Sequence, residues 1–184
     1  FTLETWVKAS STAVACPAED NAAETSFSAV GALWGSPAES VGGRGRLAVA
    51  HNRGCINVAW QNGLFGTGLH TILAASPVNL SALWRHLVIA VGNKRPHVYL
   101  DGKWLRSGLT ANIGMLYAPE IIGAYPYKTA GFTGSVDEVA IYPGQLTSTQ
   151  ILKHYLASRP DPASVDIFKA TILGDQPYAY WRLN

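Results

Sequence analysis

The sequence predicts an all-β fold: a two-sheet antiparallel sandwich with one or two short helices near its C-terminus. Three observations favour this fold class. Charged residues make up 14% of the chain, below the roughly 25% of an average soluble protein. Eighteen glycines and ten prolines separate short runs rich in Val, Ile, Trp, Tyr and Thr. A length of 184 residues corresponds to one sizeable domain, and residues 1–158 contain no fixed repeat.

Alternating side chains and turn residues predict the strands in the first half of the chain. FTLETWVKA (1–9) alternates between two faces, which is the period of a strand. The small and polar residues 10–25 predict a surface loop, and SFSAVGALWG (26–35) predicts the next strand. Residues 46–63 predict a hairpin, because two β-forming runs flank His51-Asn52-Arg53-Gly54, where Asn and Gly tolerate positive φ.

The same signals continue in the second half. TILAAS (71–76) predicts a short strand. WRHLVIAVGN (84–93) predicts a longer strand that is buried on both faces, because its apolar run is nearly continuous. HVYLDGKWLRSG (97–108) contains the hairpin signal Asp101-Gly102. Two further segments complete the set of strands: EIIGAYP (120–126) and GSVDEVAIYP (134–143).

A capping box and helical periodicity predict one clear helix after these strands. Thr147 precedes Gln150 by three residues, and the apolar face is expected to consist of Ile151, Leu152, Tyr155 and Leu156. The prolines in Arg159-Pro160-Asp161-Pro162 end this helix. A second short helix is predicted from Asp161 as N-cap to about Leu173. DQPYAYWRLN (175–184) then predicts a final strand.

Charge and hydropathy exclude two classes of partner. The net charge of +2 is small and evenly spread, so electrostatic capture of nucleic acid or of an anionic membrane is not expected. The longest apolar run, LVIAV (87–91), is far shorter than the roughly 20 residues that span a bilayer. The chain opens at Phe1 without an initiator Met or a signal-like segment, which indicates a processed or truncated N-terminus.

The two cysteines, Cys16 and Cys55, allow one disulfide. In a protein outside the cell this bridge would close a long loop and contribute about 3 to 4 kcal/mol. The alternative is a pair of separate buried thiols. No Cys/His cluster indicates zinc.

Three segments together resemble a known family. They are FTLETWVKA, LWRHLVIAVGNKRPHVYLDGKWL and IIGAYPYKTAGFTGSVDEVAIYPGQLTSTQILKHY. Their order is similar to that of the laminin-G-like (concanavalin A-like lectin/glucanase) jelly roll, and the resemblance covers most of residues 1–158. Its most specific parts are Trp84 before an apolar strand, the hairpin tip Val98–Gly102, and Gly134–Val139 running into Gln145-Leu146-Thr147.

The resemblance also implies a displaced strand. Relatives of this kind, especially in phage tail and bacterial surface proteins, often open with a helix and a strand similar to Pro-x-Ala-Tyr-Trp-Arg-Leu, a pattern that stands here at 177–183. We therefore expect residues 1–158 to form a jelly-roll domain lacking its own first strand. Residues 159–184 are expected to form a linker, a short helix and a strand that resembles the start of a following copy. Because the missing strand leaves backbone groups unpaired, we expect Tyr180–Leu183, or the equivalent strand of a neighbouring chain, to pair there by strand exchange.

Catalytic patterns are missing, so we expect no enzyme. Glucanases of this fold carry Glu-x-Asp-x-x-Glu on one strand, and the sequence has no such motif. Asp137 and Glu138 are adjacent, so a strand would point them to opposite faces, which does not suit the carboxylate pair of a glycosidase. Asp137 is expected instead to hydrogen-bond backbone groups. No Gly-x-Ser-x-Gly occurs, and the five histidines show no metal spacing, so a divergent glycoside hydrolase is the least favoured alternative.

Calcium is the one cofactor that the resemblance leaves open. Laminin-G-like relatives often bind it with Asp, Asn and backbone carbonyls at a loop rim. By residue type the weak candidates are Asp20, Asn21 and Asp137, and ordinary solvated side chains are the alternative.

Glycan recognition in β-sandwiches combines an exposed aromatic side chain with planar polar side chains. The candidates near turns and strand ends are Trp34, Arg53, Asn57, Trp60, Gln61, Tyr125 and Tyr127. For each of them, packing or a protein interface is the alternative role. The other tryptophans expected in the core or at edges are Trp6, Trp84 and Trp181.

The interpretation that we favour is a non-catalytic binding or adhesion module of a virion (phage tail or capsid-attached) or cell-surface protein. Its partner would be a glycan or a neighbouring protein subunit. The alternative is a purely structural spacer or decoration module in a larger assembly.

Overall fold

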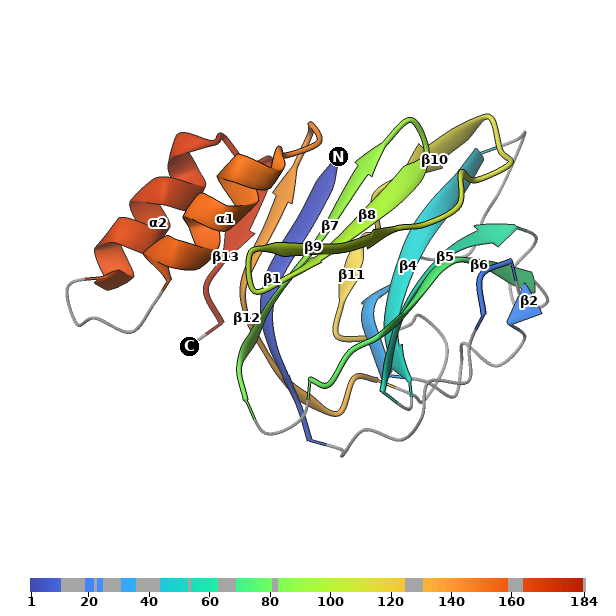
Figure 1. Ribbon diagram of the computed structural model, residues 1–184, viewed down its shortest axis with the longest axis horizontal. Helices are drawn as coiled ribbons and strands as arrows, with labels where there is room; N and C mark the ends of the chain where they lie inside the picture. The colour runs from blue at the N-terminus through green and yellow to red at the C-terminus, as the bar shows by residue number, and fades with distance from the viewer. Residues whose placement is uncertain are drawn as a thin grey trace.

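The computed structural model consists of two facing β-sheets, with a pair of helices on the outer side of the first sheet (Figure 1). It describes residues 1–10, 19–21, 23–24, 31–35, 44–52, 54–62, 69–80, 83–124, 131–158 and 164–183. This arrangement confirms the predicted antiparallel sandwich with C-terminal helices. Within the described ranges, no helix is long and apolar enough to cross a membrane.

The first sheet has β1 (Thr2–Ala9) and β7 (Arg85–Gly92) at its centre. Its order is β13 (Ala179–Trp181), β12 (Gly134–Tyr142), β1, β7, β8 (Arg95–Leu100) and β9 (Lys103–Ser107), and all neighbours are antiparallel. β7 lies between β1 and β8, and its six central residues are buried, as its continuous apolar run predicted. Asp101 (φ 51°) and Gly102 (φ 73°) form the tight turn between β8 and β9.

The second sheet is built around the predicted hairpin. Its order is β11 (Ile121–Ile122), β3 (Gly31–Gly35), β4 (Arg44–Asn52), β5 (Cys55–Asn62), β6 (Leu69–Pro77) and β2 (Ala23–Glu24). A further strand, β10 (Met115–Tyr117), pairs with β4 in parallel, next to residues 44–46. Of the predicted strand at 120–126, residues 121–122 form β11, and residues 125–126 lie outside the described part of the structure.

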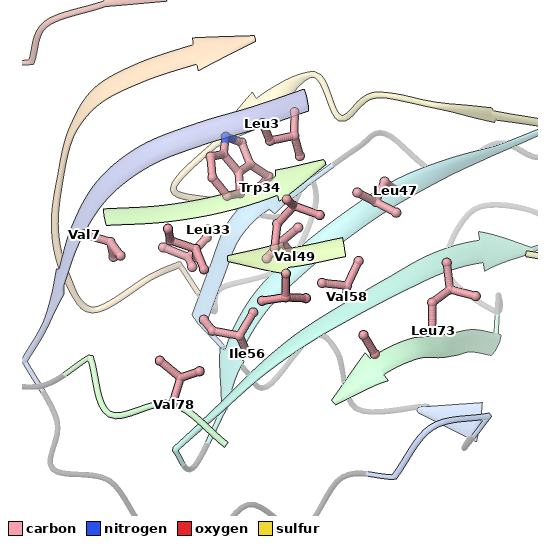
Figure 2. Packing of buried hydrophobic residues seen from close by; sticks show 14 of the residues in the cluster. Leu3, Val7, Leu33, Trp34, Leu47, Val49, Ile56, Val58, Leu73 and Val78 are labelled. Carbon is pink, nitrogen blue, oxygen red and sulfur yellow. The ribbon is translucent and has the colours of Figure 1, made fainter. Parts of the chain in front are cut away.

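The main core lies between the sheets. Leu3 and Val7 of β1 face Trp34 of β3 and the hairpin β4–β5, whose inward side chains include Val49 and Val58 (Figure 2). These side chains alternate along their strands, so each strand contributes every second residue to the core. β3 departs from this rule, because a register shift between Ala32 and Trp34 brings both Leu33 and Trp34 into the core.

A second buried cluster joins the first sheet to the helices α1 (Ser148–Ala157) and α2 (Ser164–Gly174). The predicted capping box of α1 is confirmed: Thr147 Oγ1 accepts a bond from Gln150 N–H, and the Gln150 side chain accepts one from Thr147 N–H. The predicted apolar face is partly wrong. Ile151 and His154 are buried, whereas Leu152 and Leu156 are exposed. α2 begins at Ser164, and the predicted N-cap Asp161 lies outside the described residues.

The C-terminal strand pairs with this chain's own first sheet. β13 lies antiparallel to β12, with Ala179, Tyr180 and Trp181 opposite Ile141, Ala140 and Val139. Tyr178 N–H also donates to the Ile141 carbonyl at 2.7 Å. The prediction that residues from Tyr180 onward add to a sheet is therefore confirmed within the chain. That residues 159–184 resemble the start of a following copy remains a prediction.

Candidate ligand-binding face

The outer face of the second sheet is made of unusually small side chains. Along β4, Leu47 and Val49 face the main core while Ala48 and Ala50 face the other way. The outward set forms its own buried cluster, which we call the alanine face: Ala32, Ala48, Ala50, Ala59, Ile72 and Ala75. All six side chains are buried, with exposed fractions of 5% or less.

Asn57 is the polar residue at the centre of the alanine face. It lies opposite Ala50 of β4 and Ala75 of β6 in the sheet register, and its neighbours Ile56 and Val58 face the main core. The side chain is 1% exposed, and neither its Oδ1 nor its Nδ2 has a hydrogen-bond partner within the structure described. A buried amide without partners costs about 1–3 kcal/mol.

A charged and aromatic group borders the alanine face at the start of β4. Arg46 lies two residues before Ala48, and its guanidinium pairs with the Glu120 carboxylate at 2.5 Å. The same guanidinium lies 5.7 Å from the centre of the Tyr117 ring, which is a cation–π distance. Tyr117 is partly exposed. Together these three residues combine an aromatic ring with planar polar groups, and we call them the rim.

In the sheet register, the rim residues Tyr117 and Arg46 begin a row of paired residues that crosses the sheet. Tyr117, Arg46, Gln61, His70 and Glu24 are successive partners on β10, β4, β5, β6 and β2. The predicted site residue Gln61 therefore belongs to the same row of the sheet as the rim. Its side chain lies outside the described part of the structure.

Asp20 is hydrogen-bonded to strand β6, on the other side of the alanine face from the rim. Its Oδ1 accepts the Ala75 N–H at 2.9 Å, and its Oδ2 pairs with the Arg106 guanidinium. Arg106 comes from β9 of the first sheet and also donates from Nη1 to the Ala75 carbonyl at 2.9 Å. Asn21 has a positive φ of 66°, and its N–H donates to the Ile72 carbonyl. These two calcium candidates thus hold strand β6 and its neighbours in place.

Asp137, the third calcium candidate, lies in the first sheet and is not brought near the other two. Its Oδ1 accepts the N–H groups of Glu138 at 2.7 Å and of Leu183 at 2.9 Å. The structural role predicted for Asp137 is confirmed. Across the described ranges, no group of three or more His, Cys, Asp or Glu side chains is arranged to hold a metal ion.

The structure corrects the expected positions of the tryptophans. Trp34 and Trp60 are 1% and 6% exposed and belong to the main core, so neither ring is open to a sugar. The register shift in β3 turns Trp34 inward, and Trp60 shares the inward face of β5 with Val58. Trp84 and Trp181, which were expected to pack, are each 42% exposed. Trp6 is half-buried beneath α1.

The remaining predicted residues are only partly described. Arg53, Tyr125 and Tyr127 lie outside the described residues. Cys55 is buried and disulfide-bonded, and Cys16, the other cysteine of the sequence, also lies outside them.

A buried acidic and basic cluster was not predicted from the sequence. The Glu4 carboxylate is fully buried beneath the helices; its Oε1 accepts from His86 Nε2 at 2.7 Å, and its Oε2 accepts from His154 Nδ1 at 2.9 Å. The other ring nitrogen of His154, Nε2, lies 2.8 Å from Asp175 Oδ2. The sequence offered no clear signal, because Glu4 shares its strand face with Thr2, Trp6 and Lys8 in FTLETWVKA.

The charges in this cluster support each other. Burial disfavours the Glu4 carboxylate, but its hydrogen bonds and charge interactions with His154 and His86 outweigh burial and lower the pKa of Glu4 to about 2. Burial also disfavours the His154 imidazolium, but Glu4 and Asp175 outweigh it and raise the pKa of His154. Since Glu4 has no exposed surface, the role of this cluster is structural. It holds α1 and the end of α2 against the sheet.

Solved structures share this architecture. A candidate carbohydrate binding protein from Bacteroides ovatus matches 99% of this chain and 44% of its own, with 14% sequence identity and a TM-score of 0.54. The heptameric SAP-like pentraxin of Limulus polyphemus matches 86% of this chain and 71% of its own, with 13% identity and a TM-score of 0.55. The chain therefore spans less than half of the Bacteroides protein. At these identities the likeness concerns the fold.

Sequence comparison gives the family. None of the curated proteins matches the chain. A family model does match, over residues 1–152, and its description is the concanavalin A-like lectin/glucanases superfamily. These residues include every strand of the sandwich except β13. The chain belongs to the concanavalin A-like lectin/glucanases superfamily.

Proposed function

We propose that this domain is a non-catalytic glycan-binding module of a virion or cell-surface protein, and that its ligand binds at the rim beside the alanine face. The observation that carries the proposal is the partly exposed Tyr117 ring, which lies beside the Arg46 guanidinium, itself paired with the Glu120 carboxylate. A sugar ring can stack on an exposed aromatic ring while its hydroxyls bond planar polar groups.

The exposure of the rim supports this choice. The Arg46 and Glu120 side chains are 31% and 47% exposed. The predicted candidate Asn57 is only 1% exposed, so it is a buried residue of the sheet and not a sugar contact. Gln61, Arg53, Tyr125 and Tyr127 remain proposed contacts, because planar polar and aromatic side chains suit a sugar.

The extracellular or virion setting also rests on chemistry. Cys55 is disulfide-bonded, and disulfides persist mainly in oxidising surroundings. The name of one protein with a similar fold, a candidate carbohydrate binding protein, agrees with a binding role.

Tyr117→Ala separates ligand binding from folding. We expect the variant to lose affinity by about 2- to 12-fold, because an aromatic contact is worth about 0.5–1.5 kcal/mol. We expect its stability to change by less than about 0.5 kcal/mol, because Tyr117 is partly exposed. A glycan array finds the ligand, and calorimetry measures its affinity and the Tm.

The matched control is Asn112→Ala, which removes an exposed amide outside the rim. It should leave both affinity and Tm unchanged. Tyr117→Ala with wild-type affinity would refute the site. Absence of binding to any glycan would instead favour a structural spacer, for which exposed rings such as Tyr178 (85%) and Trp104 (57%) offer packing surface.

A further inference from the structure

His154 lies between two carboxylates that come from different parts of the fold. Its Nδ1 is 2.9 Å from Glu4 Oε2 on β1, and its Nε2 is 2.8 Å from Asp175 Oδ2 just after α2. The imidazole is fully buried, as is Glu4. One ring on α1 thus connects the sandwich to the C-terminal segment.

The hydrogen bonds to the two carboxylates determine the charge of the His154 ring. An ionised carboxylate accepts hydrogen bonds and cannot donate them, so each ring nitrogen must carry a hydrogen. An imidazole with hydrogens on both nitrogens is the imidazolium cation. The neutral ring can satisfy only one of the two carboxylates and sets a lone pair against the other.

The other groups around His154 do not link Glu4 to Asp175. The Tyr142 ring of β12 lies 5.9 Å from the imidazole, and burial together with the charge of Glu4 raises the pKa of its hydroxyl, which stays neutral. His86 of β7 donates from Nε2 to Glu4 Oε1, and this contact requires only one hydrogen on the ring. The Trp6 ring of β1 lies tilted against His86, and the Tyr155 ring of α1 stacks on it.

Asp175 stands where the chain leaves α2 and turns into β13. Gln176 follows with a positive φ of 53°, and Tyr178 N–H is already bonded to the Ile141 carbonyl of β12. The other bonds of this segment to the sheet are three ladder pairs, the bonds from Tyr180 and Arg182 to Glu138, and the bond from Leu183 N–H to Asp137. The strand is short, so the tie through Asp175 adds to a small set of contacts.

We propose that His154 is a proton-controlled latch that holds β13 on the first sheet. With both nitrogens protonated it ties Asp175 to Glu4. When it loses a proton, the bond to Asp175 is lost and β13 detaches more readily from β12, leaving the edge of β12 open to another strand.

The direction of the pH effect follows from the hydrogen bonds. Burial opposes the charge on His154, but Glu4 and Asp175 together raise its pKa above the ordinary value of 6.5. A group whose pKa is raised on folding stabilises the fold fully below its unfolded value, and this contribution is lost as the pH rises past the folded value. The latch is therefore closed in mildly acidic solution and opens on the alkaline side of 6.5.

NMR of the intact chain tests the latch. The titration of the His154 ring gives its pKa, and hydrogen exchange of the Tyr178 amide, corrected for the intrinsic effect of pH, reports attachment of β13. We expect His154 to titrate above 6.5, and protection at Tyr178 to fall between 6.5 and that titration and then to level off, by a total of about tenfold for each pH unit that separates the two values. Protection at Ile89 in central strand β7 should stay constant.

Two variants sharpen the test. Asp175→Asn keeps a hydrogen-bonding group that suits the neutral ring, so His154 should titrate at lower pH and Tyr178 protection should no longer follow its titration. Glu138→Gln weakens β13 away from the latch and should lower protection equally at every pH. The latch is refuted if wild-type His154 titrates at or below 6.5, or if protection at Tyr178 stays constant between 6.5 and that titration.

Discussion

Glu4→Ala should destabilise the domain by about 3–5 kcal/mol, since removing one partner of a buried ion pair leaves the others without compensation. Here two histidines, His86 and His154, would lose their acceptor beneath the helices. For a chain of this length the loss corresponds to a drop in Tm of about 6–20 °C, measurable by calorimetry at pH 7. Because net stabilities are about 5–15 kcal/mol, part of the population would unfold at physiological temperature.

Acid unfolding checks the same carboxylate. The pKa of Glu4 is lowered to about 2 from a usual value of 4.5. Its contribution is therefore complete above 4.5 and is lost as the pH falls through about 2. Glu4→Gln, which keeps the size but not the charge, should flatten the loss of stability across this range. A Glu4→Ala variant as stable as the wild type would show that the cluster contributes nothing to folding.

Trp34→Ala should cost about 3–5 kcal/mol, because it removes a large side chain from the core between the sheets and leaves a cavity. The loss should appear in urea unfolding as a lower midpoint with little change in slope. Trp34→Phe should recover most of the stability, since it restores much of the buried volume.

The matched comparison is Tyr117→Ala on the exposed rim. It should change stability by less than about 0.5 kcal/mol, as is usual for surface positions, while weakening glycan binding. If Trp34→Ala instead folded normally and lost only binding, its ring would be a ligand platform and the assignment of the two faces would be wrong.

Local patterns in the sequence predicted most of the fold. The strand in WRHLVIAVGN, the Asp101-Gly102 turn and the Thr147–Gln150 capping box each depend on residues close together in the chain, and all three are confirmed. The inward direction of Trp34 was missed because a one-residue register shift in β3 changes the face on which a side chain lies.

The site was harder to predict because its partners are distant in sequence. Glu4 meets His86 across 82 positions and His154 across 150. No short motif encodes such contacts. Asn57 was predicted from its residue type and its position near Trp60. The two side chains lie on opposite faces of β5, and the burial of the Asn57 amide depends on how β4, β5 and β6 pack together.

The Arg106 side chain has a consequence for solubility. It belongs to β9, which ends the first sheet, and it reaches across to the Ala75 carbonyl and to Asp20 beside the second sheet. A strand that ends a sheet can recruit the same strand of another molecule and so start an aggregate, and an inward-directed charge is one of the devices that prevent it. Arg106 therefore hinders edge-to-edge pairing of β9 with a neighbouring molecule, and it also links the two sheets.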